Sequence, residues 1–159
     1  MSGRKLASLE PNSWQQATDW LRSQNYESVP LDFSTGISPV VAKLGLMLNW
    51  ESEFGYQLDS SSRNLAALHD GFDFQAPEVG GLVLELIGFE TALSEDGQWC
   101  EGFLAIIIEH SIRQLALGRR FFALVALDTT ESSLIGMKVE QLCLPYPFPF
   151  RELRSSGAA

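Results

Sequence analysis

Cysteine is scarce in this chain, which has 159 residues and contains only Cys100 and Cys143. Neither residue lies in a C-x-x-C motif, and two isolated cysteines supply neither a disulfide framework nor a zinc ligand set. Such usage is typical of proteins that remain in a reducing compartment, so we expect a cytoplasmic protein.

Long apolar runs are also missing. No run approaches the roughly 20 residues that a membrane-spanning helix needs. The N-terminus, with Arg4, Lys5 and Glu10, lacks the apolar segment of a secretory signal. The sequence therefore gives no reason to expect a membrane as partner.

Catalytic motifs are absent as well. There is no P-loop, no G-x-G-x-x-G and no G-x-S-x-G, and the chain has only two histidines, His69 and His110. His69 and Asp70 form an HD pair of the kind that metal-dependent phosphohydrolases use, but no third imidazole exists to complete such a site. We expect no enzyme activity, no metal and no cofactor.

Basic residues are nearly absent from one long segment, residues 51–109, which we call the acidic stretch. It contains a single basic residue, Arg63, and twelve carboxylates: Glu51, Glu53, Asp59, Asp70, Asp73, Glu78, Glu85, Glu90, Glu95, Asp96, Glu101 and Glu109. Its formal charge of −11 exceeds the −9 of the whole protein. Such self-repulsion destabilises a compact state, so the charge indicates either a surface for a basic partner or a general excess that favours solubility.

The same charge argues against two other partners. Nucleic acids are bound through basic patches that contact phosphates, and anionic membranes are bound through basic segments. A strongly acidic surface repels both, so we expect neither a nucleic acid nor an anionic membrane as a partner.

Hydrophobic periodicity predicts alternating helices and strands. Helices are expected at residues 13–24, 38–49, 62–70, 89–93 and 99–117, and strands at residues 29–34, 82–87 and 121–127. A polar loop is expected at residues 51–61, and Gly71 is expected to end the third helix in a left-handed conformation. Strands separated by helices predict an α/β fold with a parallel sheet and right-handed crossovers.

The two ends of the chain differ from its middle. Residues 1–28 are expected to form a neutral helical extension, residues 29–128 the main domain, and residues 129–159 a C-terminal extension. Within the latter, residues 137–144 are a candidate fourth strand at the sheet edge. Residues 145–150 (PYPFPF) alternate proline with aromatics and must be extended; they either cover their own domain or bind an aromatic groove.

The helix at residues 62–70 has two distinct faces. On a helical wheel Leu65, Leu68 and Phe72 point into a core, whereas Arg63, Ala66 and Asp70 point toward solvent. His69 lies on the border between them. Asp70 is close to the helix C-terminus, where the helix dipole disfavours negative charge, so its position is a mild indication of function.

Residues 63–70 (RNLAALHD) resemble the second-helix signature of the barstar family, intracellular inhibitors of the ribonuclease barnase. The resemblance continues through the strands at 81–87 and 121–127 and the helix at 101–117, and covers residues 29–128 in the same order of elements. It implies a barstar-like fold: a small three-stranded parallel sheet packed with helices.

The resemblance also implies a function. In this family an acidic helix and its preceding loop enter the cleft of a basic nuclease, and their carboxylates take the place of substrate phosphates. The central inhibitory aspartate matches Asp70, and an acidic residue of the long helix matches Glu109. We therefore expect a 1:1 complex with a basic toxin, a ribonuclease, with Asp73, Glu53 and Asp59 assisting by electrostatic steering.

Several positions depart from the family pattern. Ala66 replaces an aspartate, His69 replaces a tryptophan, and residues 60–62 (SSS) replace a Tyr-Tyr-Gly element, unless Phe54 and Gly55 supply it with seven residues inserted before Arg63. Arg63 also adds a positive charge to the expected contact face. A few residues decide which target such an inhibitor binds, and several of them differ here. The alternative is therefore a protein with the barstar fold that has no inhibitory role and acts as an interaction module. Such a module would be regulatory or would self-associate through residues 146–150.

Overall fold

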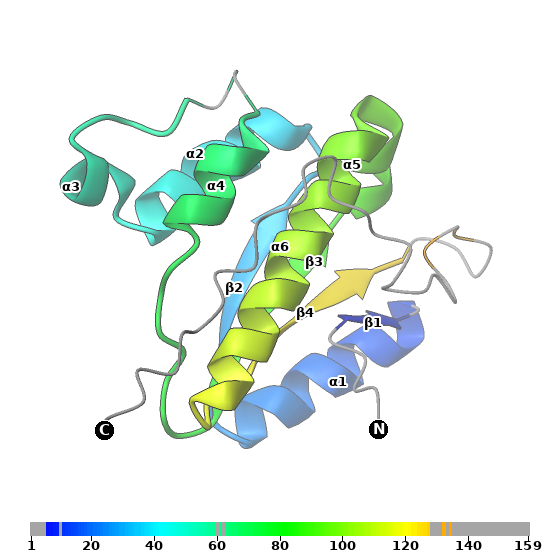
Figure 1. The fold of residues 1–159 in the computed structure, drawn as a ribbon. Coiled ribbons are helices and arrows are strands. Elements are labelled where there is room, and N and C mark those ends of the chain that lie inside the picture. Colours follow the sequence, from blue (N-terminus) through cyan, green and yellow to red (C-terminus); the bar gives the residue numbers. More distant parts are fainter. Residues whose placement is uncertain are drawn as a thin grey trace, which may run out of the picture.

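A four-stranded parallel sheet organises the protein (Figure 1). The computed structural model describes residues 6–9, 11–59, 61, 63–127, 132 and 134. The strand order is β1–β4–β3–β2, with bounds β1 Leu6–Leu9, β2 Tyr26–Asp32, β3 Gly81–Ile87 and β4 Phe121–Ala126. The three strands expected from the sequence are present and parallel, and β1 joins them at the free edge of β4.

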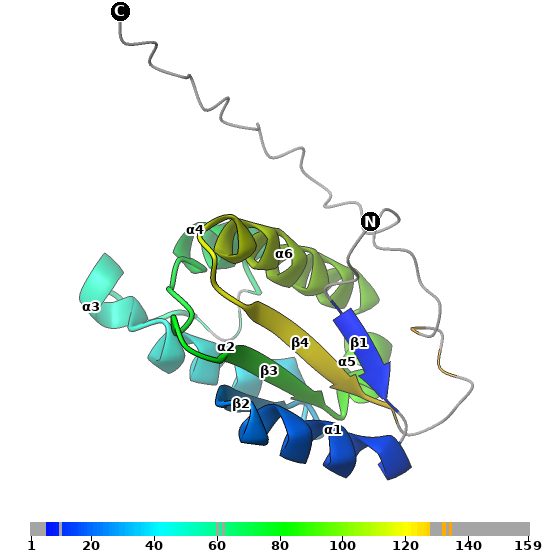
Figure 2. The same cartoon turned by 90° about the horizontal axis from the view of Figure 1, so that it is seen from below.

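Helices cover both faces of the sheet. Their bounds are α1 Pro11–Ser23, α2 Ile37–Met47, α3 Trp50–Phe54, α4 Leu65–Gly71, α5 Phe89–Glu95 and α6 Gly97–Ala116. Helices α2, α4 and α6 lie on one side, and α1 lies on the other (Figure 2). None of these described helices combines the length and the apolar character that crossing a membrane requires.

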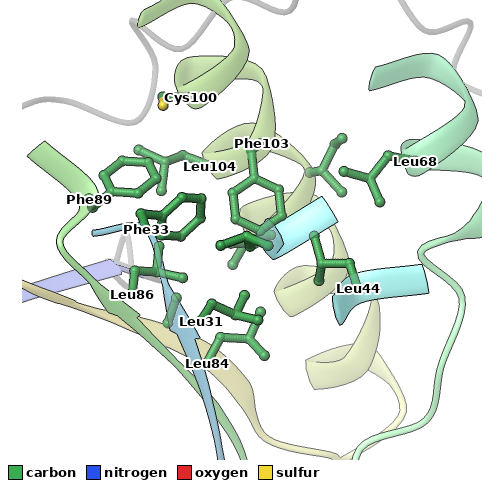
Figure 3. Close-up of a cluster of buried hydrophobic side chains, with 14 of the residues drawn as sticks. Leu31, Phe33, Leu44, Leu68, Leu84, Leu86, Phe89, Cys100, Phe103 and Leu104 are labelled. Atoms are coloured by element: carbon green, nitrogen blue, oxygen red, sulfur yellow. The ribbon is translucent and has the colours of Figure 1, made fainter. Parts of the chain in front are cut away.

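Side chains along β3 point alternately to the two faces of the sheet, and each face packs in its own apolar cluster. Leu82, Leu84 and Leu86 face the main core between the sheet and α2, α4, α5 and α6. Figure 3 shows Leu84 and Leu86 there. Val83 faces the opposite way and packs with Leu21 of α1. Each leucine removed from water stabilises the fold by about 1.5–3 kcal/mol, so the sheet is held from both faces.

The N-terminal segment contributes more than a helix. Strand β1 pairs with β4 from Leu6 opposite Ala123 to Leu9 opposite Ala126, and β2 already begins at Tyr26. The boundary expected after residue 28 therefore falls inside a strand. A four-residue strand is too short to show a reliable alternation, which is why the sequence did not predict it. The strand expected at residues 137–144 lies outside the described residues.

The start of α4 differs from the expectation, and so does the segment before it. The helix begins at Leu65 instead of residue 62, because Arg63 has a left-handed backbone (φ 47°) that a helix cannot accommodate. Asn64 caps the helix, and its side chain accepts a hydrogen bond of 3.1 Å from the Ala67 N–H. The polar loop expected at residues 51–61 was also partly wrong, since α3 occupies its first part.

Gly71 is not the left-handed C-cap that the sequence predicted, but the last residue of α4. It is required for a different reason. A Cβ atom on Gly71 would lie 2.0 Å from Cζ3 of Trp50, which is buried at the start of α3. The absence of a side chain thus lets α3 pack against the end of α4.

We predict that Gly71→Ala destabilises the protein by about 1–3 kcal/mol, because the added methyl overlaps a buried ring. Helix propensity alone would give the opposite sign. Gly97→Ala in α6 is the matched control, since nothing lies within 4 Å of its Cβ position. Urea denaturation of both variants provides the measurement, and a Gly71→Ala protein as stable as wild type contradicts the packing argument.

His110 of α6 is buried without hydrogen-bond partners. It is 1% exposed, neither ring nitrogen has a partner among the described residues, and Phe74 packs on its ring with centroids 4.4 Å apart. Burial, aided by the charge of Arg113, lowers the pKa of His110 from 6.5 to about 4. The Phe74 backbone is near enough to favour protonation weakly, but no hydrogen bond of normal geometry forms.

We predict a loss of stability in mild acid that depends on His110. The unfolded chain takes up this proton near pH 6.5 and the folded chain only near pH 4. The stabilisation is therefore complete above pH 6.5 and is lost as the pH falls to 4, by about 3 kcal/mol at 1.36 kcal/mol per pKa unit. Denaturation at pH 7.5 and 4.5 measures the loss, which should be much smaller in His110→Phe. An equal loss in both proteins contradicts the prediction.

Candidate functional site

Helices α4 and α6 lie close together along one side of the molecule (Figure 1). Leu65 of α4 packs over Gly102 of α6, where a Cβ atom would lie 2.4 Å from Leu65 Cδ1. One helical turn further along α4, His69 contacts Glu109, which is two turns beyond Gly102 on the same face of α6. The glycine therefore allows the close approach that brings His69 and Glu109 together.

His69 connects the two helices. Its Nε2 lies 2.9 Å from Oε2 of Glu109, and its Nδ1 lies 3.4 Å from Oδ1 of Asp70. Both contacts join a ring nitrogen to a carboxylate oxygen, and the shorter one, to Glu109, links α4 to α6. We call Asp70, His69, Glu109 and Asp73 the acidic site.

Asp70 is the most prominent group of this site. Its side chain is 80% exposed, compared with 43% for Glu109 and 13% for His69. Among the described residues its carboxylate contacts only His69. Asp70 therefore projects from the negative end of α4 with its charge largely available to a partner.

Ala66 lies on the same face of α4 as Asp70, and Asp73 follows the end of that helix. Ala66 is exposed one helical turn before Asp70, as the helical wheel predicted. Asp73 is exposed shortly after the end of α4. Asp73 and Glu109 both act electrostatically on His110, so the two carboxylates border the same part of α6.

The sequence analysis missed one member of this region. Nη2 of Arg113, one helical turn further along α6, lies 3.6 Å from Oε1 of Glu109. An acidic residue followed four positions later by a basic one is a recognisable helix pair, so the signal was present. Arg113 reduces the negative charge at the Glu109 side of the acidic site and leaves Asp70 as its dominant charge.

Arg63 does not add its charge to the acidic site. It forms an ion pair with Glu95 and a second one with Asp96, whose Oδ2 lies 3.3 Å away. Glu95 also accepts a hydrogen bond from the Ile37 N–H (3.0 Å), and Asp96 caps α6 at the Trp99 N–H (3.0 Å). Arg63 thus joins the start of α4 to the starts of α2 and α6.

Glu53 and Asp59 were also expected to face the partner. Glu53 is exposed on α3, which lies on the side of α4 opposite α6 in both views (Figures 1 and 2). Asp59 accepts hydrogen bonds from the backbone N–H and the hydroxyl of Ser61, at 2.8 and 2.7 Å. The structure therefore places Glu53 across α4 from α6, and it holds Asp59 in the loop before α4.

An aromatic patch borders the end of α4. Phe54 and Tyr56 are 44% and 54% exposed, and their ring centroids lie 4.5 and 6.2 Å from that of buried Trp50. Because Trp50 packs on Gly71, these rings lie near the residue that follows Asp70. The exposed rings offer a partner apolar contact on the α3 side of α4.

Comparison with known proteins gives no assignment: no protein-family model, curated protein or solved structure matches this chain. No group of three or more His, Cys, Asp or Glu side chains in the described ranges is arranged to hold a metal ion. Cys100, which is fully buried, is not poised as a nucleophile, because burial raises the pKa of its thiol to about 12.

We predict that Arg63→Gln destabilises the protein by about 1–2 kcal/mol. The substitution leaves Glu95 and Asp96 without their cation, and the pairs are largely shielded from water, with Arg63 28% exposed. Arg22→Gln is the control, because its pair with Asp19 is exposed on both sides and should contribute less than about 0.5 kcal/mol.

Thermal and urea denaturation compare the two variants, and amide exchange in α4 reports whether that helix loosens. Equal stability of both variants would show that the Arg63 pairs do not hold α4.

Proposed function

We propose that this protein is a barstar-like inhibitor that binds and neutralises a basic toxin, a ribonuclease, with Asp70 at the centre of the contact. The observation that carries the proposal is the convergence of Asp70 and Glu109 on His69. The resemblance assigned these two carboxylates independently, and His69 and Glu109 are 40 residues apart in the chain.

The charge distribution supports a basic partner. The acidic stretch contains one basic residue, and Arg63 is neutralised by Glu95 and Asp96 away from Asp70. A surface of this kind attracts a basic cleft at long range and accelerates association at low salt. The exposed Glu51 and Glu53 on α3 extend the negative field beyond α4.

The geometry of Asp70 suits insertion into a cleft. Its exposed carboxylate would replace a substrate phosphate between arginine or lysine side chains of the nuclease. Such a pair is favourable only when both partners are fully hydrogen-bonded after water is excluded. His69 contributes by holding Glu109, with Nε2 of the imidazole 2.9 Å from Oε2 of the carboxylate. Because the Glu109 side chain is already held in place, it loses little conformational freedom when a partner binds.

The aromatic patch supplies the apolar part of the contact. Phe54 and Tyr56 are rigid, exposed rings supported by buried Trp50. Interfaces concentrate their binding energy in such aromatic anchors and a few charged groups. In this proposal Asp70 provides the electrostatic anchor, and the aromatic patch takes over the role of the missing Tyr-Tyr-Gly element.

We predict that Asp70→Ala weakens binding of the cognate toxin by about 30- to 1,000-fold, as expected for the loss of a buried charged anchor. Glu109→Ala should weaken it less, because Arg113 already balances part of its charge. Asp19→Ala is the control, since Asp19 is exposed on α1, which lies on the face of the sheet opposite α4 and α6 (Figure 2).

The test uses the protein encoded beside this gene as the candidate toxin, with calorimetry for affinity, stopped flow for association, and RNA cleavage for inhibition. Association should slow as salt increases. Unchanged affinity in Asp70→Ala rejects the central role of Asp70, and binding without loss of RNA cleavage rejects the inhibitor function.

A further inference from the structure

The C-terminal half of α6 exposes an apolar strip. Ile112 and Leu115 are each 55% exposed, and Leu117, just beyond the helix, is 64% exposed. Ile112 and Leu115 are three positions apart and therefore neighbours on the helix surface. Ile108, one turn before Ile112, is only 6% exposed, so the strip continues a row of side chains that is buried further up the helix.

This strip differs from isolated exposed side chains, which are ordinary on protein surfaces. Burying one Leu or Ile side chain is worth about 1.5–3 kcal/mol, so covering two neighbours would stabilise the fold appreciably. Other exposed apolar side chains, such as Leu46 on α2, have no comparable partner at helical spacing. The strip is therefore the part of α6 where docking of an apolar segment would bury the most exposed apolar surface.

The chain beyond the described residues has the length to reach the strip. Leu134 is the last described residue, and it packs against the main core. Residues 135–150 extend to about 53 Å at 3.3 Å per residue, whereas the 20 residues of α6 span about 30 Å at 1.5 Å per residue. Residues 135–141 alone extend to about 23 Å, so a segment that begins at residue 142 and continues to residue 150 can reach the strip.

The composition of that segment suits an apolar strip. Residues 142–150 (LCLPYPFPF) carry no charge, and the chain has no longer uncharged apolar segment after Leu134. Alternating prolines keep the segment extended before it binds, so little conformational entropy is lost on docking. Tethering also gives the segment an effective concentration in the millimolar range, which favours its own domain over a second copy.

We propose that residues 142–150 dock on the strip formed by Ile112, Leu115 and Leu117 of the same chain. The docked segment would run beside Arg113 and Glu109, and so along the border of the acidic site. This contact does not depend on the proposed inhibitor function.

A natural thiol allows a direct test in the full-length chain. Cys143 lies in the proposed segment, and Cys100 is unreactive because it is buried and its thiol has a pKa raised to about 12. Leu115→Cys places a second thiol on the strip, and Leu46→Cys places one on α2 as the matched control. A disulfide needs Cα atoms within about 7 Å, so it reports contact.

Under mild oxidation, Leu115→Cys should form an intramolecular disulfide with Cys143 at least about 10-fold faster than Leu46→Cys, because docking raises the local concentration. Intact mass and peptide mapping identify the bond. Equal rates in the two variants overturn the proposal. Disulfide-linked dimers as the main product of Leu115→Cys also overturn it, and assign the strip to a second copy.

A second variant tests the apolar nature of the contact. Phe148→Ser combined with Phe150→Ser in the Leu115→Cys background should reduce the rate to that of Leu46→Cys. Both substitutions lie outside the residues that form the described helices and strands. An unchanged fast rate would show that the aromatic residues do not hold the segment, and it rejects the proposed docking mode.

Discussion

Helix α4 has only seven residues, too few for a helix to be stable alone. Its position depends on three tertiary contacts. Arg63 ties its start to Glu95 and Asp96, Leu65 packs over Gly102 at its centre, and Trp50 packs against Gly71 at its end. Everything that the acidic site presents to solvent follows from these contacts, because they determine where Asp70 and His69 lie relative to α6.

The negative charge of the protein is organised in two ways. Glu95 and Asp96 are used inside the fold, where they bind Arg63 and accept backbone N–H groups at the starts of α2 and α6. Asp70 is used differently, since it is exposed and has only His69 as a contact among the described residues. The fold thus pairs some of its carboxylates internally, while Asp70 keeps most of its side chain exposed.

Helix α6 links the core to the acidic site. Its buried residues pack on the sheet, and His110 sits uncharged among Phe72, Phe74 and Phe121. Glu109 is its immediate neighbour, yet it points to the surface, because successive helix positions are rotated by about 100°. A single rigid helix thus sets the position of the core, the acidic site and the exposed apolar strip.

Hydrophobic periodicity in the sequence was sufficient to predict the parallel strands β2, β3 and β4, the long helix α6 and the two faces of α4. It could do so because burial of alternating or helically spaced side chains is a local property of the chain. It also placed Asp70 on the solvent face. It did not predict β1, which is too short to carry a pattern, or the role of Gly71, which depends on Trp50 of a different helix. The same limit applied to Arg63: its charge is visible in the sequence, but its partners lie 32 and 33 residues away. Periodicity thus determined which side of α4 faces water. Only the tertiary structure decided which carboxylates remain free there, because pairing between distant charges depends on how the helices pack.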